Sequence, residues 1–332
     1  MRTLACGAMN ERNRPRTTTS RPRELAARVA GHVAKLFVGC ALVASAAAAR
    51  AQDIEPRAYS NAPVGVNFLV AGYAYSRGGL SLDPSLPVTD ARLESSAAVL
   101  AYARVLDLWG VSGKFDAIVP YASLSGTADY AGQAVQRSIH GLANPAFRIS
   151  ANLLGAPALT LREFGAYRQD LIVGASVQVG VPLSQYDPTR LLNIGTHRWS
   201  VKPELGVSKA IGSWTIEGQA AATFFGDNTD FFGGSTRKQD PLLALQGHVV
   251  HSFRSGIWAA FDVTYFAGGR SSIDGAAKND LQQNWRVGAT LAIPVDRRNS
   301  IKLAASSGVS ARTGNNFDLV AVAWQYRWGG GL

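Results

Sequence analysis

Charged and amide side chains recur at every second position in several stretches of this 332-residue chain, and these residues could do chemistry. Lys114 and Asp116 are two apart, as are Lys202 and Glu204, and a period of two places such pairs on one face of a β-strand. The same phase gathers an ionic set on the polar faces of the expected strands. Its basic members are Arg104, Lys114, Arg148, Lys202, Arg286, Lys302 and Arg327, and its acidic members are Asp116, Glu204, Glu217 and Asp262. His248 and several amides lie between them, namely Asn152, Gln178, Gln219, Gln246 and Gln325.

Two interpretations of this set remain open. Basic residues outnumber acidic ones, so the shared face has a positive balance and could act as a selectivity surface for a permeating solute. Alternatively, the charges pair with one another and fill the interior, because charges removed from water need partners.

The strands that carry these residues are predicted by alternation. In Asp318–Trp328, one face holds Val320, Val322, Trp324, Tyr326 and Trp328, and the other is small or polar. Eleven residues of strand, tilted by about 45°, are long enough to cross a bilayer. Similar stretches predict twelve strands at 64–76, 93–106, 113–123, 141–154, 171–182, 199–210, 214–225, 242–253, 256–266, 284–294, 300–309 and 318–328.

The connections between these strands alternate in length. Longer, polar loops are expected at 77–92, 124–140, 183–198, 226–241, 267–283 and 310–317, with tight turns at most of the others. Long external loops and short periplasmic turns are typical of an outer-membrane barrel. One connection on the short side is longer, and its Thr160-Leu-Arg-Glu163 pattern predicts a capping box and a short periplasmic helix near 160–168.

The N-terminal region explains most of the chain's formal charge of +10. Residues 1–51 hold nine Lys/Arg and two Asp/Glu, which leaves 24 basic and 21 acidic residues, a net +3 without a clustered basic face. This argues against nucleic acid as a partner. A basic stretch, an apolar stretch from Leu36 to Ala48 and Ala49-Arg50-Ala51 predict a secretory signal peptide over 1–51, cleaved near Ala51.

Together these patterns predict an all-β fold, a transmembrane antiparallel up-and-down β-barrel of twelve strands over 52–332. Only a closed barrel satisfies the backbone groups of membrane-spanning strands. The expected location is the bacterial outer membrane, after export. The expected partners are outer-membrane lipid, the barrel-assembly machinery and small hydrophobic or aromatic solutes. Tryptophans collect near the expected strand ends, as at bilayer interfaces.

An outer-membrane acyl hydrolase is the alternative from a different class. It would need a nucleophile within hydrogen-bond reach of its base. The candidate pairs are His197 with Ser200 and His251 with Ser252, but adjacent residues on a strand face opposite sides. Both cysteines, Cys6 and Cys40, lie in the leader, and the chain has no phosphate-loop, H-E-x-x-H or dinucleotide-binding motif. We therefore expect no enzyme and no cofactor.

Several segments resemble the outer-membrane family of the MetA pathway of phenol degradation. They are Pro56–Gly65, Asn144–Arg148, Glu163-Phe164, Tyr167–Gln169, Thr196–Gly206, Gln246–His248 and Tyr326–Leu332. The resemblance implies a transporter for passive uptake of aromatic or other hydrophobic compounds, without a catalytic residue. A structural barrel with a plugged lumen stays open beside this.

Overall fold

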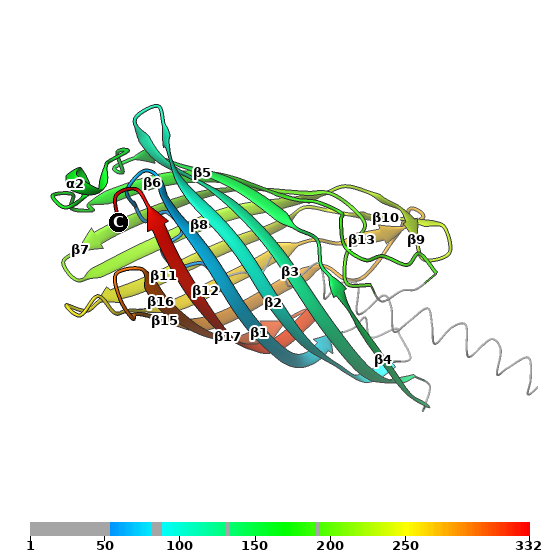
Figure 1. The fold of residues 1–332 in the computed structure, drawn as a ribbon. Helices are drawn as coiled ribbons and strands as arrows, with labels where there is room; N and C mark the ends of the chain where they lie inside the picture. Colours follow the sequence, from blue (N-terminus) through cyan, green and yellow to red (C-terminus); the bar gives the residue numbers. More distant parts are fainter. Residues whose placement is uncertain (1–53, 82–87, 131–132, 190–192) are drawn as a thin grey trace, which may run out of the picture.

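The computed structural model describes residues 54–81, 88–130, 133–189 and 193–332. Most of them lie in strands that wind into one barrel (Figure 1). The wall consists of β1 (Val66–Ser81), β2 (Val88–Leu108), β3 (Val111–Tyr130), β5 (Ala146–Leu154), β6 (Leu171–Gly180), β7 (Ser200–Ile211), β8 (Trp214–Phe225), β11 (Leu242–Ser252), β12 (Trp258–Gly268), β15 (Gln282–Pro294), β16 (Asn299–Ala311) and β17 (Gly314–Gly329).

Each wall strand pairs antiparallel with the next along the chain, and β17 pairs with β1 to close the barrel. The register between β1 and β17 is continuous from Val66↔Gly329 to Ser81↔Gly314. Because the barrel is closed, it has no open strand edge. An open edge would leave backbone groups without hydrogen-bond partners in a bilayer. The prediction of a twelve-stranded up-and-down barrel is confirmed.

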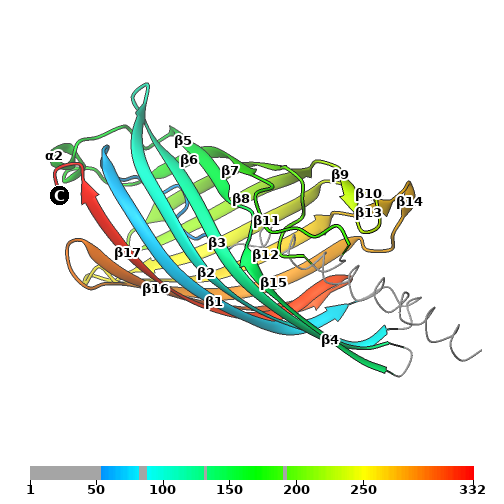
Figure 2. The same cartoon turned by 45° about the vertical axis from the view of Figure 1, so that its right-hand side comes forward.

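The fourth expected strand, 141–154, is divided in two. β4 (Gln133–Leu142) pairs with the distal half of β3, and β5 pairs with Gly113–Ile118 of the same strand. The chain leaves the ladder between them at 143–145, where Pro145 has no N–H to donate. β3 thereby carries a hairpin that extends past the barrel wall, with β2 on its other side (Figure 2).

The two ends of the barrel differ. Helix α2 (Leu161–Phe164) and the C-terminus lie at one end, here called the α2 end, together with the tight turns (Figure 1). Thr160 and Glu163 form the expected capping box, although the helix is a single turn. The opposite, far end carries a second small sheet of β9 (Asn228–Phe231), β10 (Ser235–Gln239), β13 (Ser271–Ile273) and β14 (Ala276–Ala277).

Several expected loops are wholly or partly strand. β1 and β2 pair out to Gly79↔Arg92, and β3 and β4 pair out to Tyr130↔Gln133, so much of 77–92 and 124–140 is hairpin. The small sheet lies within 226–241 and 267–283. Most of the loop expected at 310–317 is strand, because β16 ends at Ala311 and β17 starts at Gly314, although these two strands pair with each other only as far as Ser307↔Asp318. Polar composition marked these segments as loops, but pairing beyond the bilayer needs no apolar face.

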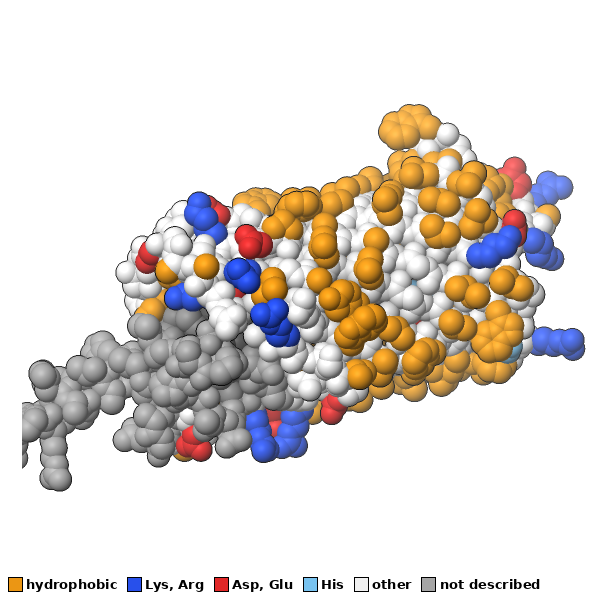
Figure 3. All heavy atoms as spheres, turned by 180° about the vertical axis from the view of Figure 1, so that it is seen from behind, with side chains coloured by type: hydrophobic (Ala, Val, Ile, Leu, Met, Phe, Trp, Pro, Cys, Tyr) orange, Lys and Arg blue, Asp and Glu red, His pale blue; other side chains and the backbone are white. Residues whose placement is uncertain are grey.

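Side chains on the outer face of the wall are exposed and apolar. Val320, Val322 and Trp324 on β17 are 56%, 44% and 42% exposed. Apolar side chains cover the middle of the barrel, and charged side chains gather toward its two ends (Figure 3). Such a band is the outer surface expected of a barrel that contacts lipid.

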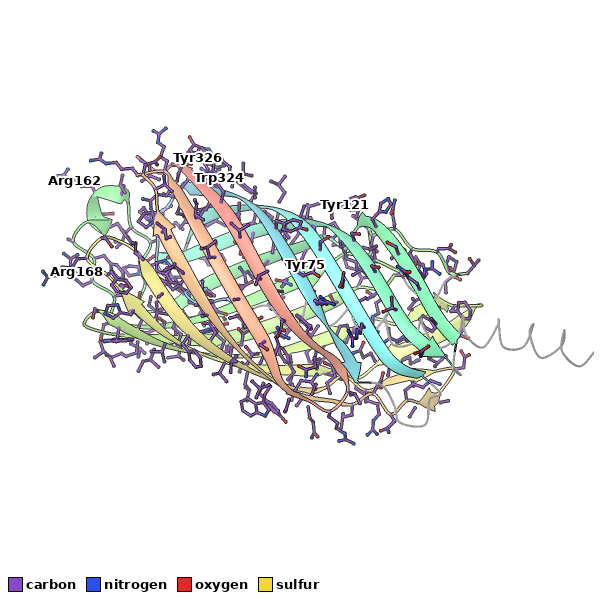
Figure 4. The ribbon with its side chains drawn as sticks, turned by 90° about the horizontal axis from the view of Figure 1, so that it is seen from below. Tyr75, Tyr121, Arg162, Arg168, Trp324 and Tyr326 are labelled. Atoms are coloured by element: carbon purple, nitrogen blue, oxygen red, sulfur yellow. The ribbon has the colours of Figure 1, made fainter. Side chains whose placement is uncertain are left out.

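Aromatic residues lie toward both ends of this band. Trp324 and Tyr326 lie near the α2 end and stack with ring centroids 6.1 Å apart, whereas Tyr75 and Tyr121 lie farther from it (Figure 4). No helix in the described part of the chain is long and apolar enough to cross a membrane. The expected signal peptide over 1–51 lies outside the described residues.

Pro203 lies within β7, where a proline has no N–H to donate to the ladder. The β7–β8 ladder pairs Val201↔Phe224 and resumes at Glu204↔Ala221 without a change of register. The pairing is therefore interrupted at Lys202 and Pro203, but there is no bulge. This is the effect of a residue that cannot donate to the ladder.

Candidate functional site

The interior of the barrel contains the segment that precedes β1. This segment, residues 54–65, is called the lumen segment below. At the α2 end its Val64 N–H donates to Leu159 O (2.8 Å) and its Gly65 N–H donates to Val105 O (3.0 Å). Farther in, Gln219 Nε2 donates to Glu55 O (3.1 Å) and a side-chain atom of Ile54 approaches Gly288 on β15. The segment therefore reaches across the interior from β8 to β15.

Tyr59 anchors the lumen segment to the wall. Its hydroxyl donates to Glu204 Oε1 (3.0 Å) and lies 3.4 Å from Ser176 Oγ, and its side chain is buried. Its ring lies against Gly174 on β6 and Gly206 on β7, which are paired with each other. A Cβ on Gly174 would lie 2.1 Å from the ring, and one on Gly206 would lie 2.2 Å from it. The two glycines thus make the space that Tyr59 fills.

Arg148 connects the lumen segment to the ionic set. Its Nη1 donates to Glu55 Oε2, and its Nε donates to Asp116 Oδ2 (2.8 Å). Nearby, Lys114 Nζ donates to Ala58 O (3.1 Å). Because Arg148 lies between two carboxylates, its charge is compensated within the protein.

Glu217 holds the backbone of the same segment. Its Oε2 accepts from the Arg57 N–H (2.6 Å), and its Oε1 accepts from Ser208 Oγ (2.8 Å). The Arg57 guanidinium lies 5.4 Å from the ring centroid of Trp258, a cation–π contact. Trp258 begins β12 on the same inward face as the buried Asp262.

His248 and Asp262 form a separate pair on β11 and β12. His248 Nδ1 lies 2.7 Å from Asp262 Oδ1, and Thr290 Oγ1 donates to Asp262 Oδ2 (3.1 Å). Both members of the pair are fully buried, and His248 Nε2 has no partner among the described residues. Within the same residues there is no group of three or more acidic, histidine or cysteine side chains that could hold a metal ion.

The inner faces of β1, β2, β16 and β17 carry small apolar residues. Ala74 on β1 pairs with Ala97 on β2 and with Ala321 on β17, and Ala321 pairs with Ala304 on β16. These four side chains, together with Val70, Val99, Ala101 and Ala323, are called the apolar wall below. The four alanine side chains are partly exposed, and the side chain of Lys302 beside them is exposed. They lie on the inner face, because the alternate residues of the same strands, such as Leu303, point outward. Partial exposure on the inner face means that solvent reaches the apolar wall.

Most residues of the predicted ionic set lie on the inner face. Lys114, Asp116, Arg148, Lys202, Glu204 and Glu217 are near the lumen segment, and Lys202 Nζ lies 3.8 Å from Glu204 Oε2. Arg286 lies apart, with Nη1 donating to Phe317 O (3.0 Å) and Nη2 to Ser306 Oγ (2.7 Å). Arg327 is at the α2 end, where its Nε donates to Arg297 O (2.7 Å).

The prediction for Arg104 was wrong. Arg104 is exposed and pairs with Phe115, whose neighbour Phe147 stacks on it at the outer surface. The inward residue at this point of β2 is Val105, which is 2% exposed. Ala97, Ala98, Ala101 and Ala103 place alanine on both faces of the strand, so hydropathy did not fix its phase.

A family model described as putative MetA-pathway of phenol degradation matches residues 75–326. The chain belongs to this family. Comparison with curated protein sequences gives no significant match.

The fold has solved relatives. An outer membrane channel from Pseudomonas putida F1 is 19% identical, with a TM-score of 0.71 over 83% of this chain and 100% of that one. The transport unit of the autotransporter AIDA-I from Escherichia coli is 8% identical, with a TM-score of 0.53 over 87% of this chain and 98% of that one. At these identities the likeness concerns the fold.

The serine–histidine pairs of the alternative function are not assembled in this member of the phenol-degradation family. The His197 ring stacks on Tyr186 with centroids 4.5 Å apart. The His251 ring lies against Trp214 and Phe253, each with centroids 4.5 Å away. Within the described part of the chain, neither ring is hydrogen-bonded to a serine.

Sequence reasoning missed the lumen segment. It lies before the first expected strand, and Pro56 and Pro63 leave it without an alternating pattern that would predict its course. One signal was available: Gly174 and Gly206 fall on the inner phase of successive strands, where the lack of side chains leaves room for another group. The sequence does not state which residue fills that room.

Proposed function

We propose that this protein is an outer-membrane channel for the passive uptake of small hydrophobic or aromatic compounds. The observation that carries the proposal is the apolar wall, whose side chains are partly exposed to solvent on the inner face. A channel for ions alone would have no use for an apolar lining, whereas an aromatic ring can move along alanine side chains without losing hydrogen bonds.

The proposed orientation places the α2 end in the periplasm and the far end outside. The tight turns at the α2 end and the longer connections at the far end support it. The apolar band and its aromatic ends would contact the lipid of the outer membrane (Figure 3). Export by a signal peptide cleaved near Ala51 remains part of the proposal.

A structural barrel with a plugged lumen is the second candidate, and the lumen segment is the observation that favours it. The segment is bound to β6, β7 and β8 through Tyr59, Arg57 and Glu55. If it filled the whole cross-section, no solute would pass. The two candidates therefore differ in one measurable property, the permeability of the outer membrane.

The test uses porin-deficient Gram-negative cells that produce the full chain. A periplasmic phosphatase reports entry of nitrophenyl phosphate, which is aromatic, and of glycerol phosphate, which is not. In intact cells, the channel should accelerate hydrolysis of nitrophenyl phosphate more than that of glycerol phosphate. After lysis, cells with and without the channel should hydrolyse each substrate at the same rate. No acceleration would favour the plugged barrel, and equal acceleration of both substrates would contradict selectivity for aromatic compounds.

A further inference from the structure

The far end of the barrel holds a buried arginine whose guanidinium is only partly hydrogen-bonded. Arg198 lies just before β7 and is 3% exposed. Its Nη2 donates to Gln239 Oε1, while its Nε and Nη1 have no partner among the described residues. A buried guanidinium with unsatisfied N–H groups is costly unless an anion is present for part of the protein's working cycle.

A second arginine lies on the same side of β10. Arg237 and Gln239 alternate along this strand, so both face Arg198, whereas Lys238 between them is exposed. Burial and then the positive charge of Arg237 lower the pKa of Arg198 well below its ordinary value. Asp227 is a nearby carboxylate, but its Oδ2 lies 2.9 Å from Lys238 Nζ on the exposed side. Arg198 is therefore buried beside a second positive charge.

Apolar rings lie directly against this charge. The Arg198 guanidinium is 4.5 Å from the ring centroid of Phe225, on the inner phase of β8. Phe225 packs against a buried cluster of Leu242, Ala244 and Phe266. Close by, Gly269 lies between the side chains of Gln239, Leu242 and Gln282, and Gln282 Oε1 is a further buried atom without a partner among the described residues. The far end thus combines anion-binding donors with an aromatic, apolar surface.

We propose that Arg198, with Arg237, binds the carboxylate of a small aromatic acid whose ring lies against Phe225 and Phe266. The Gln239 carbonyl oxygen now occupies the place of one carboxylate oxygen. Once the acid displaces it from Nη2, an edge of the guanidinium offers two parallel N–H donors, the geometry that carboxylates prefer. This inference rests on the proposed channel function and names the substrate class that its far end selects.

The experiment is isothermal titration calorimetry of benzoate with the full mature chain in detergent. Arg198→Met should weaken benzoate binding about tenfold to a hundredfold, the loss expected for hydrogen bonds to a charged group. Arg198→Lys should bind with intermediate affinity, because it keeps the charge and loses the planar fork. Lys238→Met is the matched control: it removes one positive charge from the adjacent position of β10, and benzoate affinity should stay within about twofold.

Two further probes make the assignment specific. Benzyl alcohol has the ring without the charge, and its affinity should not respond to Arg198→Met. Phosphate has the charge without the ring and should bind more weakly than benzoate. Without benzoate, Arg198→Met should melt no lower than the wild type, because it removes an incompletely paired buried charge.

Three results would overturn the proposal: no benzoate binding to the wild type, equal weakening by Arg198→Met and Lys238→Met, or phosphate binding as tightly as benzoate. Calorimetry in detergent does not depend on conduction, so its failure is distinct from failure of the channel. If nitrophenyl phosphate enters cells but benzoate does not bind, the channel stands and this site is wrong. If benzoate binds but nothing enters, the site stands and the channel is wrong.

Discussion

Arg148 is the side chain that connects the lumen segment to the strands of the barrel. It is bonded to Glu55 of the segment and to Asp116 of β3. The sequence predicted its inward phase, but not that its partner would come from a residue more than ninety positions away. Pairing of this kind depends on which segment enters the barrel, and alternation carries no information about that.

Replacing Arg148 with Met should destabilise the barrel by about 3–5 kcal/mol, because two carboxylates are left buried without their cation. The measurement is the free energy of unfolding by urea from lipid vesicles. The triple variant Glu55→Gln, Asp116→Asn, Arg148→Met should recover most of the loss, since it removes the whole network. Equal free energies of unfolding for the wild type and Arg148→Met would show that these ion pairs do not stabilise the barrel.

Ala304 and Ala305 test the assignment of faces with the same residue type at neighbouring positions. Ala305 pairs with Val320 on the outer face, and Ala304 pairs with Ala321 on the apolar wall. Arg at position 305 should cost about 2–4 kcal/mol if it lies near the midplane of the bilayer. Arg at position 304 faces water and should cost clearly less in the same unfolding assay. A reversed order would contradict the phase of β16.

At the scale of elements, strand positions were predictable because alternation is local. The capping box was predictable for the same reason, since Thr160 and Glu163 are three residues apart. The course of the lumen segment was not predictable, because it is fixed by contacts with β6, β7 and β8 and has no periodicity of its own. The far-end sheet was missed because its strands are short and polar.

The lumen segment should be released by crowding Tyr59. Gly206→Ala places a Cβ in the Tyr59 ring and should destabilise the barrel by about 1–3 kcal/mol, as overpacking does. It should also raise single-channel conductance as the segment leaves the lumen. Tyr59→Ala should raise conductance too, and Gly206→Ala should have little added effect in that background. Additive effects of the two changes would mean that the ring and the glycine do not act through one contact.

Helix α2 should respond to pH through Glu163. Hydrogen bonds from the Thr160 backbone N–H and then the Thr160 hydroxyl lower the pKa of Glu163 below its ordinary value. A carboxyl with a lowered pKa in the folded state stabilises the cap above its unfolded pKa, and this contribution is lost as pH falls through the folded value. The Thr160 amide shift, followed by NMR, should titrate below the ordinary glutamate range. Glu163→Gln should abolish the titration, and a midpoint at or above that range would contradict the capping box.

At the scale of the whole molecule, the barrel has two unlike interior sides. The lumen segment and the paired charges contact β3, β5–β8, β12 and β15, and the apolar wall covers β1, β2, β16 and β17. The sequence predicted an overall positive lumen that would favour anions. That expectation weakens, because Arg104 points outward and Arg148 and Lys202 lie beside carboxylates. Selection of anions is instead assigned to Arg198 at the far end.

In the proposed channel, solutes pass along the apolar wall, and cysteine modification tests this passage most directly. The chain from Gln52 onward contains no cysteine, so a single introduced thiol reports one position. Ala321 faces the apolar wall and its neighbour Val320 is 56% exposed on the outer face. In planar bilayers, a charged methanethiosulfonate reagent should reduce the single-channel current of Ala321→Cys permanently and leave that of Val320→Cys unchanged. Membranes that stay sealed, or an Ala321→Cys current that does not change on modification, would contradict the account.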